Sequence, residues 1–273
     1  MKIRIISAVI GILVVVGLLI IGEIIPIVLY TVLSLVSAIT LSELLNAKGI
    51  LSDFKISVPT LLFGILTPLL STTPFKFIPI FLFVLTLFTV LILFNDKVKL
   101  EDILYVITTS ILVVACFCCM VLSCDFHNGL YTSFYVVLCL AIPWIADGGA
   151  YFTGTFFGKH KLCPKISPKK TVEGAVGGVV AGIIGGILIG VIYQCLIYKN
   201  VSVNFVLIGV IGIINSILSI IGDLSFSLIK RSCHIKDFGS VIPGHGGLLD
   251  RFDSVVFTAP IIFLAGQYFA FLQ

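Results

Sequence analysis

The stretch that decides the fold is residues 174–198, GAVGGVVAGIIGGILIGVIYQCLIY, which contains no charged side chain. About 20 apolar residues in a helix cross the hydrocarbon core of a bilayer. Further uncharged runs of at least 18 residues lie at 5–22, 24–42, 56–75, 77–95, 103–124, 128–146, 200–222 and 254–273. These runs are continuous, whereas a transmembrane barrel would show alternating segments of about ten residues. The sequence therefore predicts membrane-spanning helices.

The composition of the whole chain agrees with this prediction. Of 273 residues, 59% are hydrophobic and 11% are charged, against roughly 25% charged residues in a soluble domain. A water-soluble globular domain and a disordered chain are both excluded. Run 5–22 follows Lys2 and Arg4, as a signal peptide would, but its length and the missing small-residue cleavage site favour a retained span. We predict an all-α, polytopic integral membrane protein with about nine transmembrane helices.

Lysine and arginine residues predict the orientation, because cytoplasmic loops are enriched in them. If the N-terminus is cytoplasmic and the runs cross alternately, only Lys76 and Lys199 face outside. The other basic residues then face inside: Lys2, Arg4, Lys48, Lys55, Lys97, Lys99, Lys159, Lys161, Lys165, Lys169, Lys170, Lys230, Arg231, Lys236 and Arg251. The net charge of +4 follows largely from this topology and does not suggest nucleic acid as a partner. A basic cytoplasmic face would attract anionic lipids and phosphorylated ligands.

The two parts of the chain differ in their polar content. Residues 1–140 form hydrophobic spans with short loops, and Glu23 and Glu43 border the second span in interfacial positions. Residues 141–273 carry two polar segments, 147–173 and 223–253, which are expected to face the cytoplasm. We expect both parts to form a single membrane domain whose catalytic region is 141–273.

Glycine recurs at every fourth position of the seventh run, at Gly174, Gly178, Gly182, Gly186 and Gly190. Such a strip lets another helix approach closely. The sequence leaves open whether the strip packs inside one chain or forms a dimer contact.

Asp223 lies at the inner end of the eighth run, where ionisable residues are costly and usually functional. Ser227 and Lys230 share its face if the helix continues, by their spacing of four and seven residues. The alternative is an ion pair within the helix, with Lys230 extended toward the interface.

The next polar residues surround a segment that is rich in glycine. Pro243, Gly244, Gly246 and Gly247 flank His245 and prevent regular helix there. Glycines let backbone N–H groups approach a phosphate. Asp250 and Asp253, three residues apart, are expected on one face of the entering last helix. Carboxylates beside lysines are typical of Mg²⁺-dependent phosphoryl chemistry.

The segment from Trp144 to Gly174 contains Asp147, Ser167, Lys169, Lys170, Thr171 and Glu173. It is not a P-loop, because His160 follows Gly158-Lys159 and Thr153 occupies the first glycine position. Its lysines and hydroxyls nevertheless suit an oligophosphate. For Lys161 and Lys165 we prefer the simpler interpretation of a cytoplasmic basic loop.

These residues together resemble a known family. Ser227-Leu-Ile-Lys230-Arg231, Lys236-Asp237 and His245-Gly246-Gly247-Leu-Leu-Asp250-Arg251-Phe-Asp253 resemble the signature of the phosphatidate cytidylyltransferase (CDP-diacylglycerol synthase) family. Ser167-Pro-Lys169-Lys170-Thr171 and Glu173-Gly174 are similar to a second stretch of that family. The resemblance covers Trp144 to Asp253, and residues 1–140 match in hydropathy alone.

The resemblance implies a membrane nucleotidyltransferase of phospholipid biosynthesis. It would convert CTP and phosphatidate into CDP-diacylglycerol and pyrophosphate with Mg²⁺, as a homodimer. The distribution of basic residues independently predicts an active site on the cytoplasmic side. The compact length favours the cell inner membrane of a bacterium over an organellar membrane. Asp223 and Asp250 would hold the metal. The implied catalytic residues are Asp223, Lys230, Arg231, Lys236, Asp237, His245, Asp250, Arg251 and Asp253. The candidate substrate contacts are Asp147, Ser167, Lys169, Lys170, Thr171, Glu173, Ser227, Gly246 and Gly247.

Two other functions would also suit a membrane protein with polar cytoplasmic segments. A lipid-alcohol kinase of the dolichol kinase type would use CTP and release CDP, but the match across 227–253 argues against it. A transporter should carry charges along a path through the bilayer. Here the charges gather at one face, and no internal repeat is visible, so transport is disfavoured.

Overall fold

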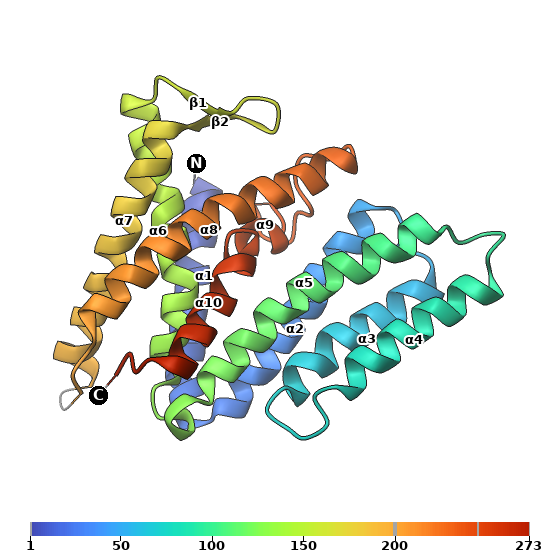
Figure 1. Cartoon of the computed structure of the whole chain (residues 1–273), viewed down its shortest axis with the longest axis horizontal. Coiled ribbons are helices and arrows are strands. Elements are labelled where there is room, and N and C mark those ends of the chain that lie inside the picture. The colour runs from blue at the N-terminus through green and yellow to red at the C-terminus, as the bar shows by residue number, and fades with distance from the viewer. Residues whose placement is uncertain (1, 199–200, 245, 273) are drawn as a thin grey trace. The chain divides into compact units, whose positions relative to one another are not determined.

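The computed structural model describes residues 2–198, 201–244 and 246–272 (Figure 1). Two sequence-based expectations, those for His245 and Lys199, lie outside these described residues. By packing, the chain divides into two units. The first unit consists of Met1–Thr132 and Cys233–Phe252, and the second of Ser133–Ser232 and Asp253–Gln273.

In the described part of the chain, the first unit has five long helices, one short α-helix and a 3-10 turn at Phe126–Gly129. The α-helices are α1 (Lys2–Ile24), α2 (Pro26–Ala47), α3 (Phe54–Leu70), α4 (Ile78–Leu93), α5 (Leu100–Cys124) and α9 (Leu249–Phe252). Helix α2 packs against α3 and α5, and α3 also packs against α4 (Figure 1). Helix α3 begins where the Asp53 carboxylate accepts the backbone N–H of Lys55 at 3.1 Å, a standard N-cap arrangement. Fully buried leucines of α2, Leu41, Leu44 and Leu45, form the centre of the core.

The second unit contains long helices and a small β-hairpin. Its elements are α6 (Thr132–Phe157), β1 (Lys161–Cys163), β2 (Ser167–Thr171), α7 (Val172–Ile192), a π-helical turn (Tyr193–Ile197), α8 (Phe205–Ser232) and α10 (Val255–Tyr268). Helix α8 packs against both α7 and α10. Strands β1 and β2 are antiparallel and connect α6 to α7 (Figure 1).

The glycine strip of α7 packs inside the second unit. A Cβ at Gly178 would lie 2.9 Å from the carbonyl oxygen of Ala146 in α6. A Cβ at Gly190 would meet Ile208 and Phe205 of α8 at 3.0 and 3.1 Å. The strip therefore brings α7 against α6 and α8, which decides between the two roles that the sequence left open.

Each of the nine predicted runs overlaps a helix of the described chain, so the all-α prediction is confirmed. By length and composition, five of the described helices can cross a membrane: α2, α5, α6, α7 with its π-helical turn, and α8. Shorter apolar helices lie at Val9–Ile24, Phe54–Leu70, Ile78–Leu93 and Val255–Tyr268. The count of nine crossings and the cytoplasmic N-terminus stay predictions.

The polar segments are more ordered than the sequence suggested. Helix α6 continues through Phe157 and α8 through Ser232, well beyond the ends of the uncharged runs. Asp147 and Asp223 therefore lie inside helices rather than in loops. The hairpin occupies what was expected to be an irregular basic loop. The division at residue 140 stays a functional prediction; by packing, Cys233–Phe252 belongs with the N-terminal helices.

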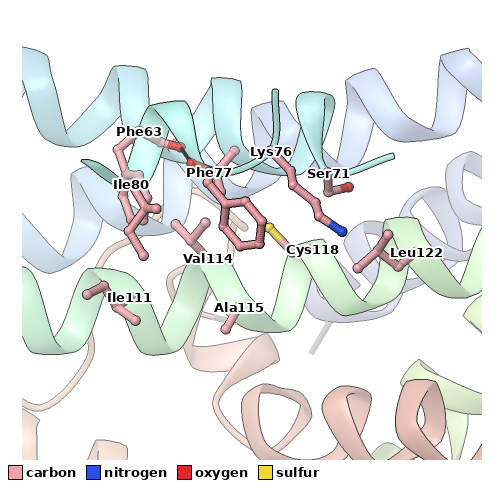
Figure 2. Close-up of a pocket in the computed structure, with 11 residues that line it drawn as sticks. Phe63, Ser71, Lys76, Phe77, Ile80, Ile111, Val114, Ala115, Cys118 and Leu122 are labelled. Atoms are coloured by element: carbon pink, nitrogen blue, oxygen red, sulfur yellow. Dashed lines mark hydrogen bonds between the residues drawn. The ribbon is translucent and has the colours of Figure 1, made fainter. Parts of the chain in front are cut away.

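The first unit also has an apolar pocket of about 220 Å³ between α3, α4 and α5. Phe63, Phe77, Ile80, Ile111 and Val114 supply much of its lining. Figure 2 shows Lys76 stretched along one end of this pocket, close to Cys118 and Leu122. None of the predicted site residues lines it.

Candidate active site

Three carboxylates of the second unit come from three elements. Asp147 lies in α6, Asp223 in α8, and Asp253 in the turn that precedes α10. The Ser219 hydroxyl donates to Asp147 Oδ1 at 3.0 Å, and the Ser227 hydroxyl donates to Asp223 Oδ1 at 3.4 Å. A Cβ at Gly222 would lie 2.6 Å from the carbonyl oxygen of Asp253, so glycine allows this turn to approach α8 closely.

Two lysines pair with these carboxylates. The Lys170 ammonium, on β2, forms an ion pair with Asp223 Oδ2. The Lys230 ammonium, on α8, lies 3.6 Å from Asp253 Oδ2. Asp223, Ser227 and Lys230 do share a helix that continues, as predicted. Asp223 pairs with Lys170, and Lys230 lies near Asp253; the alternative of an Asp223–Lys230 pair within α8 is not tested by these contacts.

The hairpin separates two neighbouring lysines. Along a strand, successive side chains point to opposite faces. Lys169 is exposed, whereas Lys170 is half-buried and reaches Asp223. We call Asp147, Asp223 and Asp253 the carboxylate cluster. Of the two predicted lysines, Lys170 therefore lies at this cluster and Lys169 lies at the surface.

Burial first, and electrostatic repulsion second, disfavour negative charge on the carboxylates Asp147 and Asp253. Burial raises the pKa of Asp253, and the charge of Asp223 raises it further, while Lys230 opposes the shift. Asp147 interacts with Asp223 and Lys170 as well. The cluster therefore holds more negative charge than its buried surroundings favour, and additional cationic charge would stabilise it.

Thr171 and Glu173 hold the hairpin to α7. The Thr171 hydroxyl accepts the N–H of Gly174 at 3.1 Å and caps α7. The Glu173 carboxylate accepts the N–H groups of Lys159 and His160 at 3.0 and 3.2 Å and lies 2.6 Å from His160 Nδ1. Both residues were predicted to contact substrate, and both have a structural role that positions Lys170. Ser167 lies on β2, half-buried.

The first unit contains the segment rich in glycine, residues 237–248, which we call the glycine loop. Asp250 Oδ2 accepts the N–H of Phe238 at 2.9 Å and that of Gly247 at 3.0 Å. The Ile242 N–H donates to the Gly246 carbonyl at 3.0 Å, and Gly244 and Gly246 have φ values of +79° and +84°. The left-handed φ values explain glycine at both positions. The Gly247 N–H, expected to approach a phosphate, is engaged by Asp250.

A residue that the sequence did not single out closes this loop. Glu43 of α2 is 5% exposed, and its two carboxylate oxygens accept the N–H groups of Leu248 and Leu249 at 2.9 and 2.7 Å. The sequence places Glu43 at the border of the second span and does not predict this contact. Its partners are 205 and 206 residues away in the sequence, so no local pattern reveals them.

The remaining predicted residues lie around these two clusters. In the first unit, Lys236, Asp237 and Arg251 are exposed. In the second unit, Arg231 is exposed in the last turn of α8. Asp250 and Asp253 do not share one helix, because α9 ends at Phe252 and α10 begins at Val255. Ser219, which the sequence analysis missed, lies four residues before Asp223, and this spacing could have identified it.

The donor chemistry of the second unit suits Mg²⁺, which prefers carboxylate oxygens. Among residues 2–198, 201–244 and 246–272, no three His, Cys, Asp or Glu side chains are arranged to hold a metal ion together. Mg²⁺ is commonly bound by one or two carboxylates, with waters and substrate phosphates completing its shell. The predicted pair, Asp223 and Asp250, lies in different units and stays a prediction.

The fold is that of an α-helical protein with several apolar helices long enough to cross a membrane. Its candidate site contains carboxylates that pair with lysines. The chain belongs to the Cytidylyltransferase family, whose model matches residues 2–269.

Similar proteins in bacteria are named phosphatidate cytidylyltransferase. The Bacillus subtilis protein is 30% identical over 181 residues, 66% of this chain and 64% of that protein. The Haemophilus influenzae protein is 36% identical over 146 residues, 53% of this chain and 48% of its own length. The Staphylococcus haemolyticus protein is 34% identical over 128 residues, 47% of each chain. The chain thus spans about half to two thirds of the curated relatives it matches.

Proposed function

We propose that this protein is a phosphatidate cytidylyltransferase, which transfers CMP from CTP to phosphatidate and yields CDP-diacylglycerol and pyrophosphate. The family membership supports the cytidylyl transfer, and the names of the relatives support the lipid acceptor. The single structural observation that carries the proposal is the ion pair between Lys170 of the hairpin and Asp223 of α8. This pair sets a cation that could bind phosphate beside a potential metal ligand, where the uncharged stretch of α8 ends.

The proposed reaction needs no nucleophile from the protein. A phosphatidate phosphate oxygen attacks the α-phosphorus of CTP, a new P–O bond forms, and the bond to the pyrophosphate oxygen breaks. Because both substrates and the leaving pyrophosphate are anionic, the protein must supply positive charge. Lys170 and Lys230 supply it within the second unit, and the exposed Arg231 and Lys236 are further candidates for phosphate contacts.

We propose Mg²⁺ as the metal of this reaction, because the carboxylate cluster carries excess negative charge and offers oxygen ligands. Asp223 would hold the ion in the second unit, and the sequence predicts Asp250 as its other ligand. Bound Mg²⁺ would neutralise charge on the transferring phosphoryl group and the leaving pyrophosphate. Asp147, fixed by Ser219, would orient groups around the cluster.

We propose that the protein lies in the cell inner membrane with these clusters on the cytoplasmic side, where CTP is available. The apolar helices support the membrane setting. The distribution of basic residues supports the orientation. The homodimer implied by the family resemblance would use surfaces other than the glycine strip, because the strip is occupied by α6 and α8.

The test uses purified full-length protein in mixed micelles with α-labelled CTP, Mg²⁺ and either phosphatidate or diacylglycerol. Labelled CDP-diacylglycerol and an equal amount of pyrophosphate are expected when phosphatidate is the lipid, and neither product is expected with diacylglycerol. Chelation of the metal and the Asp223→Asn substitution should each abolish the product. Glu101→Gln, which changes an exposed carboxylate in the first turn of α5, is the matched control.

Other outcomes would overturn the proposal in distinct ways. CDP and phosphatidate formed from diacylglycerol would identify a lipid kinase instead. Full activity of Asp223→Asn would refute the assigned site. No turnover of either lipid by folded protein would refute cytidylyl transfer to phosphatidate.

A further inference from the structure

Three consecutive backbone N–H groups of the first unit donate hydrogen bonds to carboxylates. The Gly247 N–H donates to Asp250 Oδ2 at 3.0 Å, the Leu248 N–H to Glu43 Oε1 at 2.9 Å, and the Leu249 N–H to Glu43 Oε2 at 2.7 Å. Asp250 is close in sequence, but Glu43 comes from α2. The end of the glycine loop is therefore held by one local and one distant carboxylate.

The space around Glu43 shows how closely the loop fits it. A Cβ at Gly239 would lie 2.5 Å from Glu43 Oε1, and a Cβ at Gly247 would lie 2.7 Å from Glu43 Oε2. Neither glycine has a positive φ angle, so the effect of a side chain at either position would be to displace the Glu43 carboxylate. The loop closes over the Glu43 carboxylate from two sides.

A buried carboxylate is stable only when hydrogen bonds replace its lost hydration. Glu43 is buried, and its two bonds to backbone N–H groups are charge-assisted, the stronger class of hydrogen bond. Both oxygens are needed, because each accepts a different N–H. A glutamine at this position would offer one acceptor and turn an NH₂ group toward the other N–H.

We propose that Glu43 is a positioning residue that fixes the glycine loop and, through it, the orientation of Asp250. This inference rests on the proposed function, since it assigns Glu43 an effect on a reaction in which Asp250 takes part. The N-terminal helices then do more than anchor the protein, because α2 supplies the Glu43 carboxylate that holds the glycine loop beside Asp250. Both Glu43 oxygens are occupied by backbone N–H groups, so we assign it a role through the loop rather than a substrate contact.

The first test compares wild type with Glu43→Gln, Glu43→Asp and Glu43→Ala in the cytidylyl transfer assay while Mg²⁺ is varied. Loss of one charge-assisted hydrogen bond corresponds to roughly a tenfold to hundredfold effect. We expect Glu43→Gln to need roughly tenfold or more Mg²⁺ for half-maximal rate, although its volume is conserved. Glu43→Asp keeps two acceptor oxygens and should recover part of the loss. Glu101→Gln should leave the Mg²⁺ dependence unchanged.

The second test is amide hydrogen exchange of the folded protein, which does not depend on activity. Peptides covering residues 238–250 should exchange faster in Glu43→Gln than in wild type, while peptides of α7 should not change. Gly239→Ala provides an independent perturbation, because its new Cβ displaces the same carboxylate without removing it. It should reproduce the exchange and Mg²⁺ effects even if a Glu43 variant fails to fold.

The outcomes separate this inference from the proposed function. If wild type transfers no CMP, the proposed function fails, and the exchange measurement still decides whether Glu43 holds the loop. If wild type is active and Glu43→Gln keeps its Mg²⁺ dependence and loop protection, the positioning role is refuted. A uniform drop in rate with unchanged Mg²⁺ dependence and unchanged exchange would also refute it.

Discussion

Lys169 and Lys170 are chemically identical neighbours, yet the structure gives them different environments. The alternation of β2 directs Lys170 to Asp223 and leaves Lys169 exposed. A sequence motif of two lysines cannot distinguish them, because their difference depends on the hairpin. The strand thus selects which lysine acts at the carboxylate cluster.

Replacing Lys170 should therefore affect activity more than replacing another lysine of the same hairpin. Lys170→Ala leaves Asp223 without its cation, and we expect a loss of roughly tenfold to a hundredfold in kcat/KM, the range found for groups that orient metal ligands. Lys165→Ala, at an exposed position, is the control and should retain activity. The cytidylyl transfer assay measures both. Equal rates for the two variants would contradict the assignment.

The pair of Lys230 and Asp253 is the more buried of the two, with side chains 11% and 10% exposed. Removing one partner of a buried ion pair costs about 3–5 kcal/mol, because the other charge stays buried. We expect Lys230→Ala to lower the thermal midpoint of the detergent-solubilised protein clearly. The double variant Lys230→Ala/Asp253→Ala should be more stable than Lys230→Ala alone. If the double variant is the less stable one, the pair does not behave as a buried ion pair.

At the scale of elements, the glycines of α7 and α8 make contrasting contacts. A Cβ at Gly178 would meet Ala146 and Ala150 of α6 at 2.9 and 3.1 Å, whereas a Cβ at Gly209 of α8 has nothing within 4 Å. Helical glycine costs about 1 kcal/mol relative to alanine when no packing requires it. The two positions therefore separate a packing requirement from simple helix propensity.

We expect Gly178→Ala to destabilise the protein, because the carbonyl of Ala146 cannot move without shifting α6. Gly209→Ala should leave stability unchanged or raise it by up to about 1 kcal/mol. Thermal unfolding of the two variants in one detergent gives the comparison. An equal response at both positions would show that the strip does not set the packing of α6 on α7.

The sequence predicts the places of the helices well and their ends poorly. Uncharged runs locate the helices, since burial in lipid requires them, and the glycine spacing of α7 predicts its close packing. The ends are missed at α6 and α8, because polar residues such as Asp147 and Asp223 find partners inside the protein. The hairpin is missed because its lysines and prolines show no strand pattern, and its base depends on Glu173 bonds to the preceding turn.

At the scale of the whole molecule, the chain enters the first unit twice. Cys233–Phe252 returns to the N-terminal helices after the chain has formed most of the second unit. The motif of the glycine loop predicts its own importance, but it contains no information about Glu43. Long-range contacts of this kind follow from the packing of α2, which a single sequence does not encode locally.

The predicted topology can be tested independently of the fold. With the N-terminus cytoplasmic and nine crossings, the C-terminus lies outside, so a fused alkaline phosphatase should be active there and a fused green fluorescent protein dark. The same reporters placed after residue 165, in the hairpin, should give the opposite result. Matching signals at both sites would refute an odd number of crossings between the hairpin and the C-terminus.

The contact between Glu43 and the glycine loop also bears on synthesis. Glu43 is translated 205 residues before Leu248. The backbone N–H groups that bind its carboxylate therefore become available only after most of the later helices have been made. During that interval α2 carries an uncompensated acidic group, which disfavours final burial of this helix end. Packing of the N-terminal helices is therefore completed by a segment that is translated 205 residues after Glu43.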